Sequence, residues 1–70
     1  MNVGGSPGDG YLPEPYLYVG PRSAHRPGDP DYWNAPFGAA LTYTELRATD
    51  RPAERALEFL LRGAELLANG

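Results

Sequence analysis

The sequence predicts an α+β fold: a small two-stranded sheet, formed as a wide hairpin, with a short helical turn and one C-terminal amphipathic helix. In two stretches of the chain, two types of side chain alternate from one residue to the next, which is typical of strands. The C-terminal third repeats its apolar residues with the 3.6-residue period of a helix. Because 8 Pro and 9 Gly punctuate only 70 residues, we expect a flexible tail at residues 1–10 and a single ββα domain at residues 11–70.

The first ten residues are predicted to be disordered because of their composition. They contain four Gly and almost nothing apolar, so burial would not offset the entropy lost on ordering. A Gly loop that cradles phosphate is the functional alternative. That motif requires a preceding strand and a following Lys with Ser or Thr, and this segment has neither.

Two short strands are expected on either side of a Pro-rich loop. The first is Tyr16–Val19, where tyrosines alternate with Leu and Val. Pro15 directly before it favours an edge position, because proline cannot donate a ladder hydrogen bond. The second strand is predicted at Phe37–Leu41. The loop of residues 21–30 makes a wide hairpin the preferred connection, with a parallel arrangement as the alternative.

Local signals predict where the helices begin and end. Thr42 and Glu45 have the spacing of a capping box, which predicts a helical turn from Tyr43 to about Ala48. Asp50 is then predicted to cap a second helix, which runs to about Ala68.

The C-terminal helix is apolar around most of its circumference. A charged stripe roughly 100° wide leaves a non-polar arc of about 220°, about twice the width that packing on one sheet requires. The centre of the arc contains Ala53, Ala56, Leu57, Leu60, Ala64 and Leu67. Phe59 and Leu66 lie on one flank, and Leu61 and Ala68 on the other. Either the loop aromatics cover a flank, or a second copy or another protein does.

This excess of apolar surface predicts a non-enzymatic protein-interaction module that self-associates or docks on a larger protein. Each large apolar side chain left in water would forgo about 1.5–3 kcal/mol, and a chain of this length has a small core. The residues predicted at the contact are Phe59, Leu61, Leu66, Tyr32 and Trp33. Gly63 in mid-helix indicates the close approach of a backbone or a ring, with a chance glycine as the alternative.

A small-molecule binding protein is the second hypothesis. Aromatic rings with a few polar groups form many ligand sites. The candidate ligand-binding residues are Tyr16, Tyr18, Asn34 and Glu14. This hypothesis predicts a concave site in which Tyr16, Tyr18 and Trp33 converge on Asn34 or Glu14.

Catalysis, cofactors and metals are not expected. The chain has no Cys and a single His, so thiol chemistry is excluded and His25 is the one histidine general base. His25 could form a loose metal cluster with Asp29 and Asp31, but a solvated loop histidine is the preferred interpretation. An enzyme centred on His25 stays as a third hypothesis without a substrate.

Charge and hydropathy favour protein partners over nucleic acid or membrane. The net charge is −3, and the six basic residues, all Arg, are spread along the chain, whereas nucleic-acid binding requires clustered positive charge. The longest apolar run is far shorter than the ~20 residues of a membrane span. We expect a cytoplasmic location, and the abundance of Gly, Ala, Arg and Pro favours a bacterial source with GC-rich coding sequence.

From Asp31 to Ala68 the chain resembles the C-terminal part of an uncharacterised actinobacterial family of unknown function. The residues that carry the resemblance are Asp31–Gly38, Leu41–Leu46 and Ala56–Leu60. The family has no assigned activity. The resemblance implies a detached terminal ββα unit, and such a unit would require a partner surface.

Overall fold

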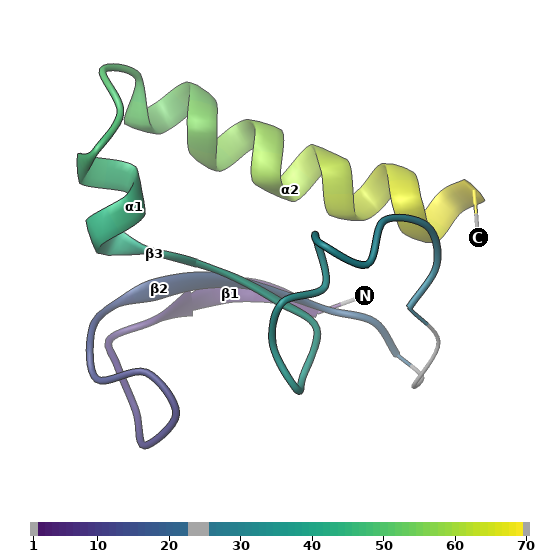
Figure 1. Cartoon of the computed structure of the whole chain (residues 1–70), viewed down its shortest axis with the longest axis horizontal. Helices are drawn as coiled ribbons and strands as arrows, with labels where there is room; N and C mark the ends of the chain where they lie inside the picture. The colour runs from purple at the N-terminus through teal and green to yellow at the C-terminus, as the bar shows by residue number, and fades with distance from the viewer. Residues whose placement is uncertain (1, 23–25, 70) are drawn as a thin grey trace.

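The computed structural model describes residues 2–22 and 26–69, which form three strands and two helices (Figure 1). The elements are β1 (Asn2–Ser6), β2 (Tyr16–Gly20), β3 (Ala39–Thr42), α1 (Tyr43–Arg47) and α2 (Pro52–Asn69). The strands form one sheet in the order β1-β2-β3, and α2 lies across one of its faces (Figure 1). The α+β prediction is confirmed.

The hairpin between β2 and β3 is antiparallel, with Tyr16 opposite Thr42 and Val19 opposite Ala39. β3 begins two residues later than predicted because a tight turn precedes it. In this turn the backbone N–H groups of Ala35 and Gly38 each donate to the carbonyl of the other residue, both at 3.1 Å. Gly38 has a φ of 146°, which favours glycine, so the preceding Phe37 lies in the turn and not in the strand.

The prediction of a two-stranded sheet was wrong, because the segment expected to be a flexible tail contributes β1. Asn2–Ser6 pairs with β2 along the edge of the sheet, and Gly4 lies opposite Tyr18. A Cβ atom at Gly4 would come within 2.8 Å of the Tyr18 hydroxyl oxygen, so the Tyr18 ring covers the strand where it has no side chain of its own. Such cross-strand aromatic cover compensates for glycine in a strand.

The loop between β1 and β2 is also ordered, by one carboxylate. Oδ1 of Asp9 accepts from the backbone N–H groups of Tyr11 and Leu12, both at 2.9 Å. Oδ2 accepts from the hydroxyl of Tyr16 at 2.6 Å. The Tyr16 bond is the main reason why the pKa of Asp9 is lowered, and it also raises the pKa of Tyr16.

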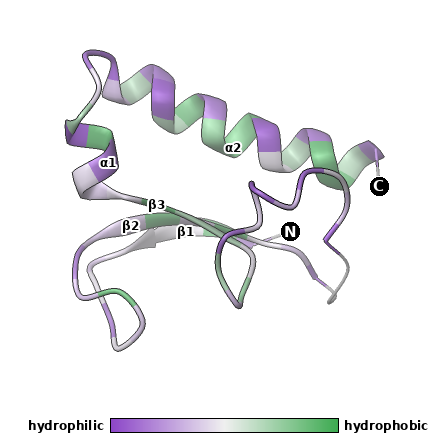
Figure 2. Cartoon of the chain, viewed as in Figure 1, coloured by the Kyte–Doolittle hydropathy of each residue, from purple (hydrophilic) through white to green (hydrophobic). Residues whose placement is uncertain are grey.

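The core lies between the sheet and α2. Val19, Ala39 and Leu41 project from the sheet and pack with Phe59 of the helix. Hydrophilic and hydrophobic segments alternate along α2, as expected of an amphipathic helix (Figure 2).

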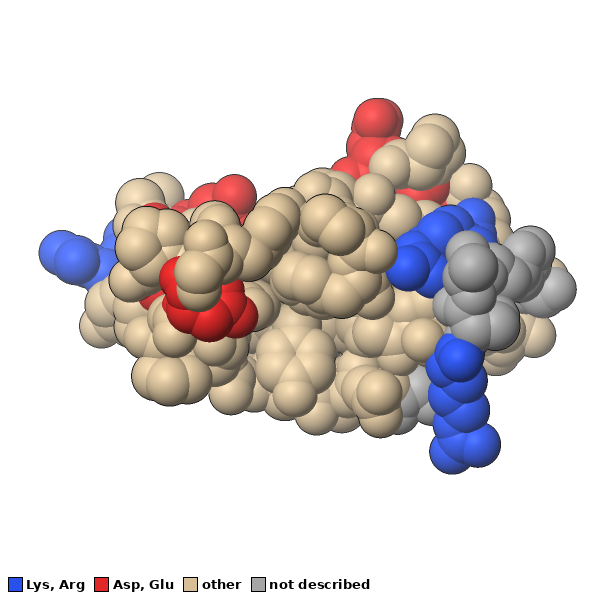
Figure 3. Space-filling model, turned by 90° about the horizontal axis from the view of Figure 1, so that it is seen from below, with Lys and Arg blue, Asp and Glu red and all other residues tan. Residues whose placement is uncertain are grey.

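The other face of the sheet is covered by aromatic rings from β2 and the loops. The rings of Tyr16 and Tyr18 lie 6.0 and 6.4 Å from that of Phe37, and Tyr11 lies edge-on to Phe37 at 5.4 Å. Figure 3 shows the molecule from this side: the middle of the surface carries no charged side chains, and basic groups lie toward its ends.

The capping box predicted for α1 is confirmed. Oγ1 of Thr42 accepts from the N–H of Glu45 at 3.1 Å, and the Glu45 carboxylate accepts from the N–H of Thr42 at 3.3 Å. α1 ends at Arg47, one residue earlier than predicted. The first residue of α2 is Pro52, so Arg51, and not the predicted Asp50, directly precedes the helix.

Candidate functional site

One side of α2 is closed by the loop that precedes β3. The hydroxyl of Tyr32 donates to the carbonyl oxygen of Phe59 at 2.7 Å, and the two rings lie 5.4 Å apart. A Cβ atom at Gly63 would collide with the Tyr32 hydroxyl and would lie 3.0 Å from a methyl of Val19. The prediction that a ring approaches Gly63 is therefore confirmed.

The loop is held on the helix by further contacts of its two aromatic residues. The indole N–H of Trp33 donates to the carbonyl oxygen of Pro27 at 2.8 Å, and its ring stands edge-on to Tyr32 at 4.8 Å. Burial raises the pKa of Tyr32 to about 12. Leu66 packs against Gly28, which leaves no space there for a Cβ atom.

These contacts correct the predicted interface on this flank. Phe59 and Leu66 are only 4% and 8% exposed, and Tyr32 and Trp33 are half-buried against the core. The first two therefore stabilise the fold of the single chain and are not available to a partner. Of the five predicted contact residues, only Leu61 is well exposed.

The opposite side of α2 is an exposed apolar surface, which we call the apolar stripe. It consists of Ala53, Leu57, Leu60, Leu61, Ala64 and Ala68. Leu57 and Leu61 are 56% and 59% exposed, and Leu60 and Ala64 are half-buried. Leu57 was missed as a contact residue because it lies at the centre of the apolar arc, and the predicted contact residues of the helix were all taken from its flanks. The helix is rotated so that the side bearing Gly63 faces the sheet, which leaves Leu57 exposed. A glycine on one side of a helix is the signal that could have indicated this rotation.

The sheet leaves apolar groups uncovered as well. α2 packs on β2 and β3, and on β1 the side chain of Val3 is 48% exposed. Near α1, a small hollow of about 170 Å³ is lined mainly by apolar side chains. Its lining residues are Gly5, Ser6, Pro15, Tyr16, Leu17, Tyr43 and Leu46.

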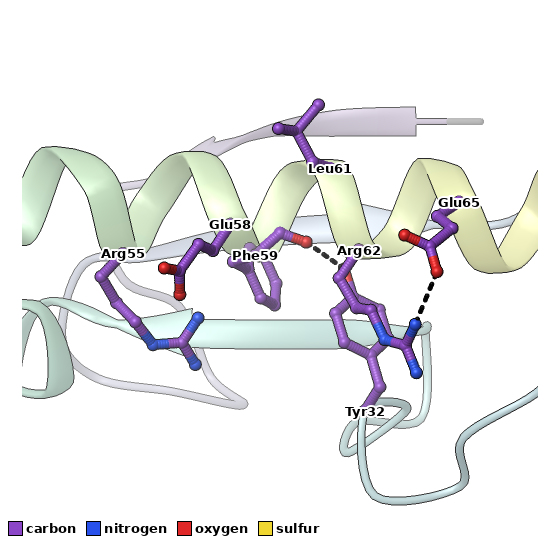
Figure 4. A pocket seen from close by; sticks show the side chains of 7 residues that line it. All are labelled: Tyr32, Arg55, Glu58, Phe59, Leu61, Arg62 and Glu65. Atoms are coloured by element: carbon purple, nitrogen blue, oxygen red, sulfur yellow. Dashed lines mark hydrogen bonds and ion pairs between the residues drawn. The ribbon is translucent and has the colours of Figure 1, made fainter.

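A charged groove of about 450 Å³ borders α2 on the side of Tyr32 (Figure 4). Arg55, Glu58, Arg62 and Glu65 line it, and Arg62 forms an ion pair with Glu65 at 2.8 Å. Figure 4 shows that the side chain of Leu61 points away from these charges. The groove therefore lies on the side of α2 that Tyr32 closes, and Arg55 and Arg62 point away from the apolar stripe.

The predicted ligand-binding residues are distributed over separate parts of the fold. Tyr16 and Tyr18 lie together on the outer face of the sheet, with ring centres 6.3 Å apart, whereas Trp33 lies against Tyr32 on the helix side. A hollow of about 240 Å³ beside the two tyrosines is also lined by Phe37 and by residues at the end of β2. The expected convergence of Trp33 with Tyr16 and Tyr18 does not occur.

The two polar candidates have structural partners. The Asn34 side chain accepts from the N–H of Ala40 at 2.8 Å and donates to its carbonyl oxygen at 3.0 Å. The Glu14 carboxylate accepts from the backbone N–H and the hydroxyl of Thr44 at 2.9 and 2.6 Å, and these bonds lower its pKa. Asn34 therefore fixes the loop to β3, and Glu14 fixes the start of α1.

Other kinds of site have no support in the described residues. His25 lies outside them, so its predicted role as a loop residue is untested. Within residues 2–22 and 26–69, no group of three or more His, Cys, Asp or Glu side chains could hold a metal ion. Neither of the two described helices has the length and hydrophobicity needed to cross a lipid bilayer. Comparisons of the chain with protein-family models, curated proteins and solved structures found no match.

Proposed function

We propose that the chain is a non-enzymatic protein-interaction module that binds another polypeptide through the apolar stripe of α2. The exposure of Leu57 and Leu61, at 56% and 59%, is the observation that carries the proposal. Covering each leucine would contribute about 1.5–3 kcal/mol. Exposed contiguous apolar surface on a small protein is typical of a contact site.

The small size of the core supports this function. Seven hydrophobic residues are buried among those described: Tyr16, Val19, Ala39, Ala40, Leu41, Phe59 and Leu66. Two of the seven are alanines, and three come from β3 alone. A single core in a chain this short supplies only about 3–5 kcal/mol, so contact with a second polypeptide would add stability where the fold has little.

The electrostatics also favour binding over catalysis. Catalytic groups are commonly buried and have perturbed pKa values, but the described residues include no buried charged or polar side chain. The pKa values of Asp9 and Glu14 are lowered by hydrogen bonds that order a loop and a helix start. These shifts have structural causes.

Site-specific photo-crosslinking in the native cells tests the proposal. The photoreactive benzoylphenylalanine replaces Leu61 in one variant and Tyr11, an exposed aromatic residue of the outer face, in a control variant. We expect a polypeptide adduct from position 61 and none from position 11. Adding Leu57→Glu should abolish the adduct, because a carboxylate in the stripe cannot be buried unpaired. Equal labelling from both positions, or no adduct from position 61, would contradict the proposed function.

Small-molecule binding by the outer face is the second candidate, supported by the hollow of about 240 Å³ beside Tyr16 and Tyr18. A metabolite that binds there would raise the unfolding temperature of the native chain, and Tyr18→Ala would remove this shift. No shift with any member of a broad metabolite panel would argue against this candidate.

A further inference from the structure

We propose that the free edge of β1 binds an extended segment of a different polypeptide, which adds to the sheet as a fourth strand and places a leucine or phenylalanine side chain in the hollow beside Gly5. The site lies on the sheet and does not depend on the apolar stripe, so the inference goes beyond the proposed function. An edge strand presents a row of unpaired N–H and C=O groups. Addition of a strand to such an edge is a recurrent mode of peptide recognition.

The opposite edge of the sheet, formed by β3, is closed by the chain itself. The N–H and the carbonyl oxygen of Ala40 both bond to the side chain of Asn34, at 2.8 and 3.0 Å. The N–H of Thr42 donates to the Glu45 carboxylate at 3.3 Å. The backbone groups at the outer edge of β3 therefore have partners, and a strand added there would have to displace the Asn34 side chain.

The Asn34 bonds also determine which backbone groups of β1 point outward. In an antiparallel ladder, residues that bond to each other alternate with residues whose N–H and C=O groups point away from each other. Because Ala40 bonds outward, its partner Tyr18 directs its backbone groups toward β1, where it lies opposite Gly4. Val3 and Gly5, on either side of Gly4, therefore direct their N–H and C=O groups to the outer edge.

This outer edge of β1 is open. Within residues 2–22 and 26–69, the backbone groups of Val3 and Gly5 form no hydrogen bond to a residue outside the sheet. The sequence of β1, Asn-Val-Gly-Gly-Ser, has no proline and no charged side chain, the features that commonly protect an edge strand. The two edges of the sheet thus differ, and only that of β1 offers four unobstructed backbone groups to a further strand.

The hollow near α1 gives the added strand a site for a side chain. Gly5 lies opposite Leu17 on the face of the sheet that packs on the helices. A Cβ atom at Gly5 would lie 3.9 Å from its nearest neighbour, a methyl group of Leu17, so the space beside Gly5 is open. The residue of the added strand opposite Gly5 points to this same face. It would enter the hollow of about 170 Å³.

The size and lining of the hollow select the side chain. Leu17, Tyr43 and Leu46 contribute apolar groups to its wall, and an apolar cavity of about 150 Å³ holds a benzene ring. Leucine and phenylalanine therefore fit. A second copy of the chain fits less well, because the largest aliphatic side chain that its β1 offers is Val3 and its β3 edge is closed. The expected occupant is thus a different polypeptide with apolar residues at alternate positions.

A displayed library of random peptides, selected on the full chain, tests the site. We expect enriched peptides with alternating apolar residues, one of them Leu or Phe. Their affinity should fall at least about tenfold for Gly5→Leu, because the new side chain fills the hollow. The matched control is Gly10→Leu, at a loop position where a Cβ atom would have no neighbour within 4 Å, and it should bind like the native chain. Far-UV circular dichroism verifies that each variant is folded.

The backbone bonds are tested by Val3→Pro and by amide hydrogen exchange measured by NMR. Proline at position 3 removes an N–H that points outward and not into the ladder, so the chain should stay folded while peptide affinity falls about fivefold. In the free chain, exchange should be slow at Gly4 and fast at Val3 and Gly5. An enriched peptide should slow exchange at Val3 and Gly5.

Several results would overturn the inference. Peptides that bind Gly5→Leu as tightly as the native chain would place the binding site elsewhere, and a library without enriched peptides would show that the edge binds no strand. Self-association that slows exchange at Val3 and Gly5 would identify a second copy as the occupant. The proposed function fails separately: Leu57 does not line the hollow, so Leu57→Glu should abolish the position-61 adduct and leave peptide affinity unchanged.

Discussion

The two sides of α2 carry side chains of similar size but differ in what covers them. On one side Phe59 and Leu66 are buried, because Tyr32 and its loop close over the helix. On the other side Leu57 and Leu61 are more than half exposed. The difference teaches that hydrophobicity alone does not determine which side of this helix faces the core. The close contact of Tyr32 with Gly63 selects the buried side. Among residues 2–22 and 26–69, no second loop closes over Leu57 and Leu61 on the opposite side.

The largest expected difference between the two sides of α2 is in the stability lost when one apolar side chain on each side is truncated. Phe59→Ala should cost about 3–5 kcal/mol, because it empties the centre of the core; this equals the stability that a core of this size supplies, so the variant should be largely unfolded without urea. Leu57→Ala should change the free energy of unfolding by less than about 0.5 kcal/mol at protein concentrations where the chain is monomeric. Urea denaturation followed by circular dichroism measures both. Similar losses for the two variants would mean that both sides of α2 are covered within one chain.

Gly63→Ala should have the next largest effect. The added methyl group would collide with the Tyr32 hydroxyl, and overpacking of this kind costs about 1–3 kcal/mol, which exceeds the gain of about 1 kcal/mol from helix propensity. In a Tyr32→Phe background the loss should be smaller, because the nearest atom is gone. A stabilising Gly63→Ala would show that the ring does not lie against the helix at this point.

The smallest expected effect is that of Tyr32→Phe on folding stability and on how this stability depends on pH. Loss of the hydrogen bond to Phe59 should cost about 0.5–1.5 kcal/mol at neutral pH. Because the pKa of Tyr32 rises from 10.0 to about 12 on folding, the fold favours the neutral phenol. This stabilisation is complete below pH 10 and is lost as the pH rises toward 12. Tyr32→Phe should therefore reduce the alkaline loss of stability measured by thermal unfolding, and Tyr43→Phe at an exposed position should not. If Tyr32→Phe lost as much stability at alkaline pH as the native chain does, the result would contradict a buried Tyr32 hydroxyl.

Much of the fold followed from local signals in the sequence. The capping box of Thr42 and Glu45 places α1, and the 3.6-residue pattern places α2, because both depend on residues close together in the chain. β1 could not be predicted, since its stability depends on Tyr18, a residue 14 positions from the Gly4 that its ring covers. Composition describes what a segment contains and not what covers it.

An exposed apolar surface on α2 was predicted from the sequence, but most of the residues that form it were not. The sequence indicates more apolar surface on α2 than one sheet can cover, and the side chains of Leu57 and Leu61 form the exposed part of that surface. The choice between the Phe59 flank and the Leu61 flank depended on the rotation of the helix about its axis. That rotation is determined by the contact between Tyr32 and Gly63, two residues 31 positions apart in the sequence.

The position of Trp33 has a practical consequence for optical experiments. The single tryptophan is anchored to Pro27 and stands against Tyr32, on the closed side of α2. Its emission should therefore report the detachment of this loop and remain nearly silent when two molecules come together. Tryptophan fluorescence and sedimentation thus observe different events in this protein, and a fluorescence change without a mass change would mark the loop as its first point of opening.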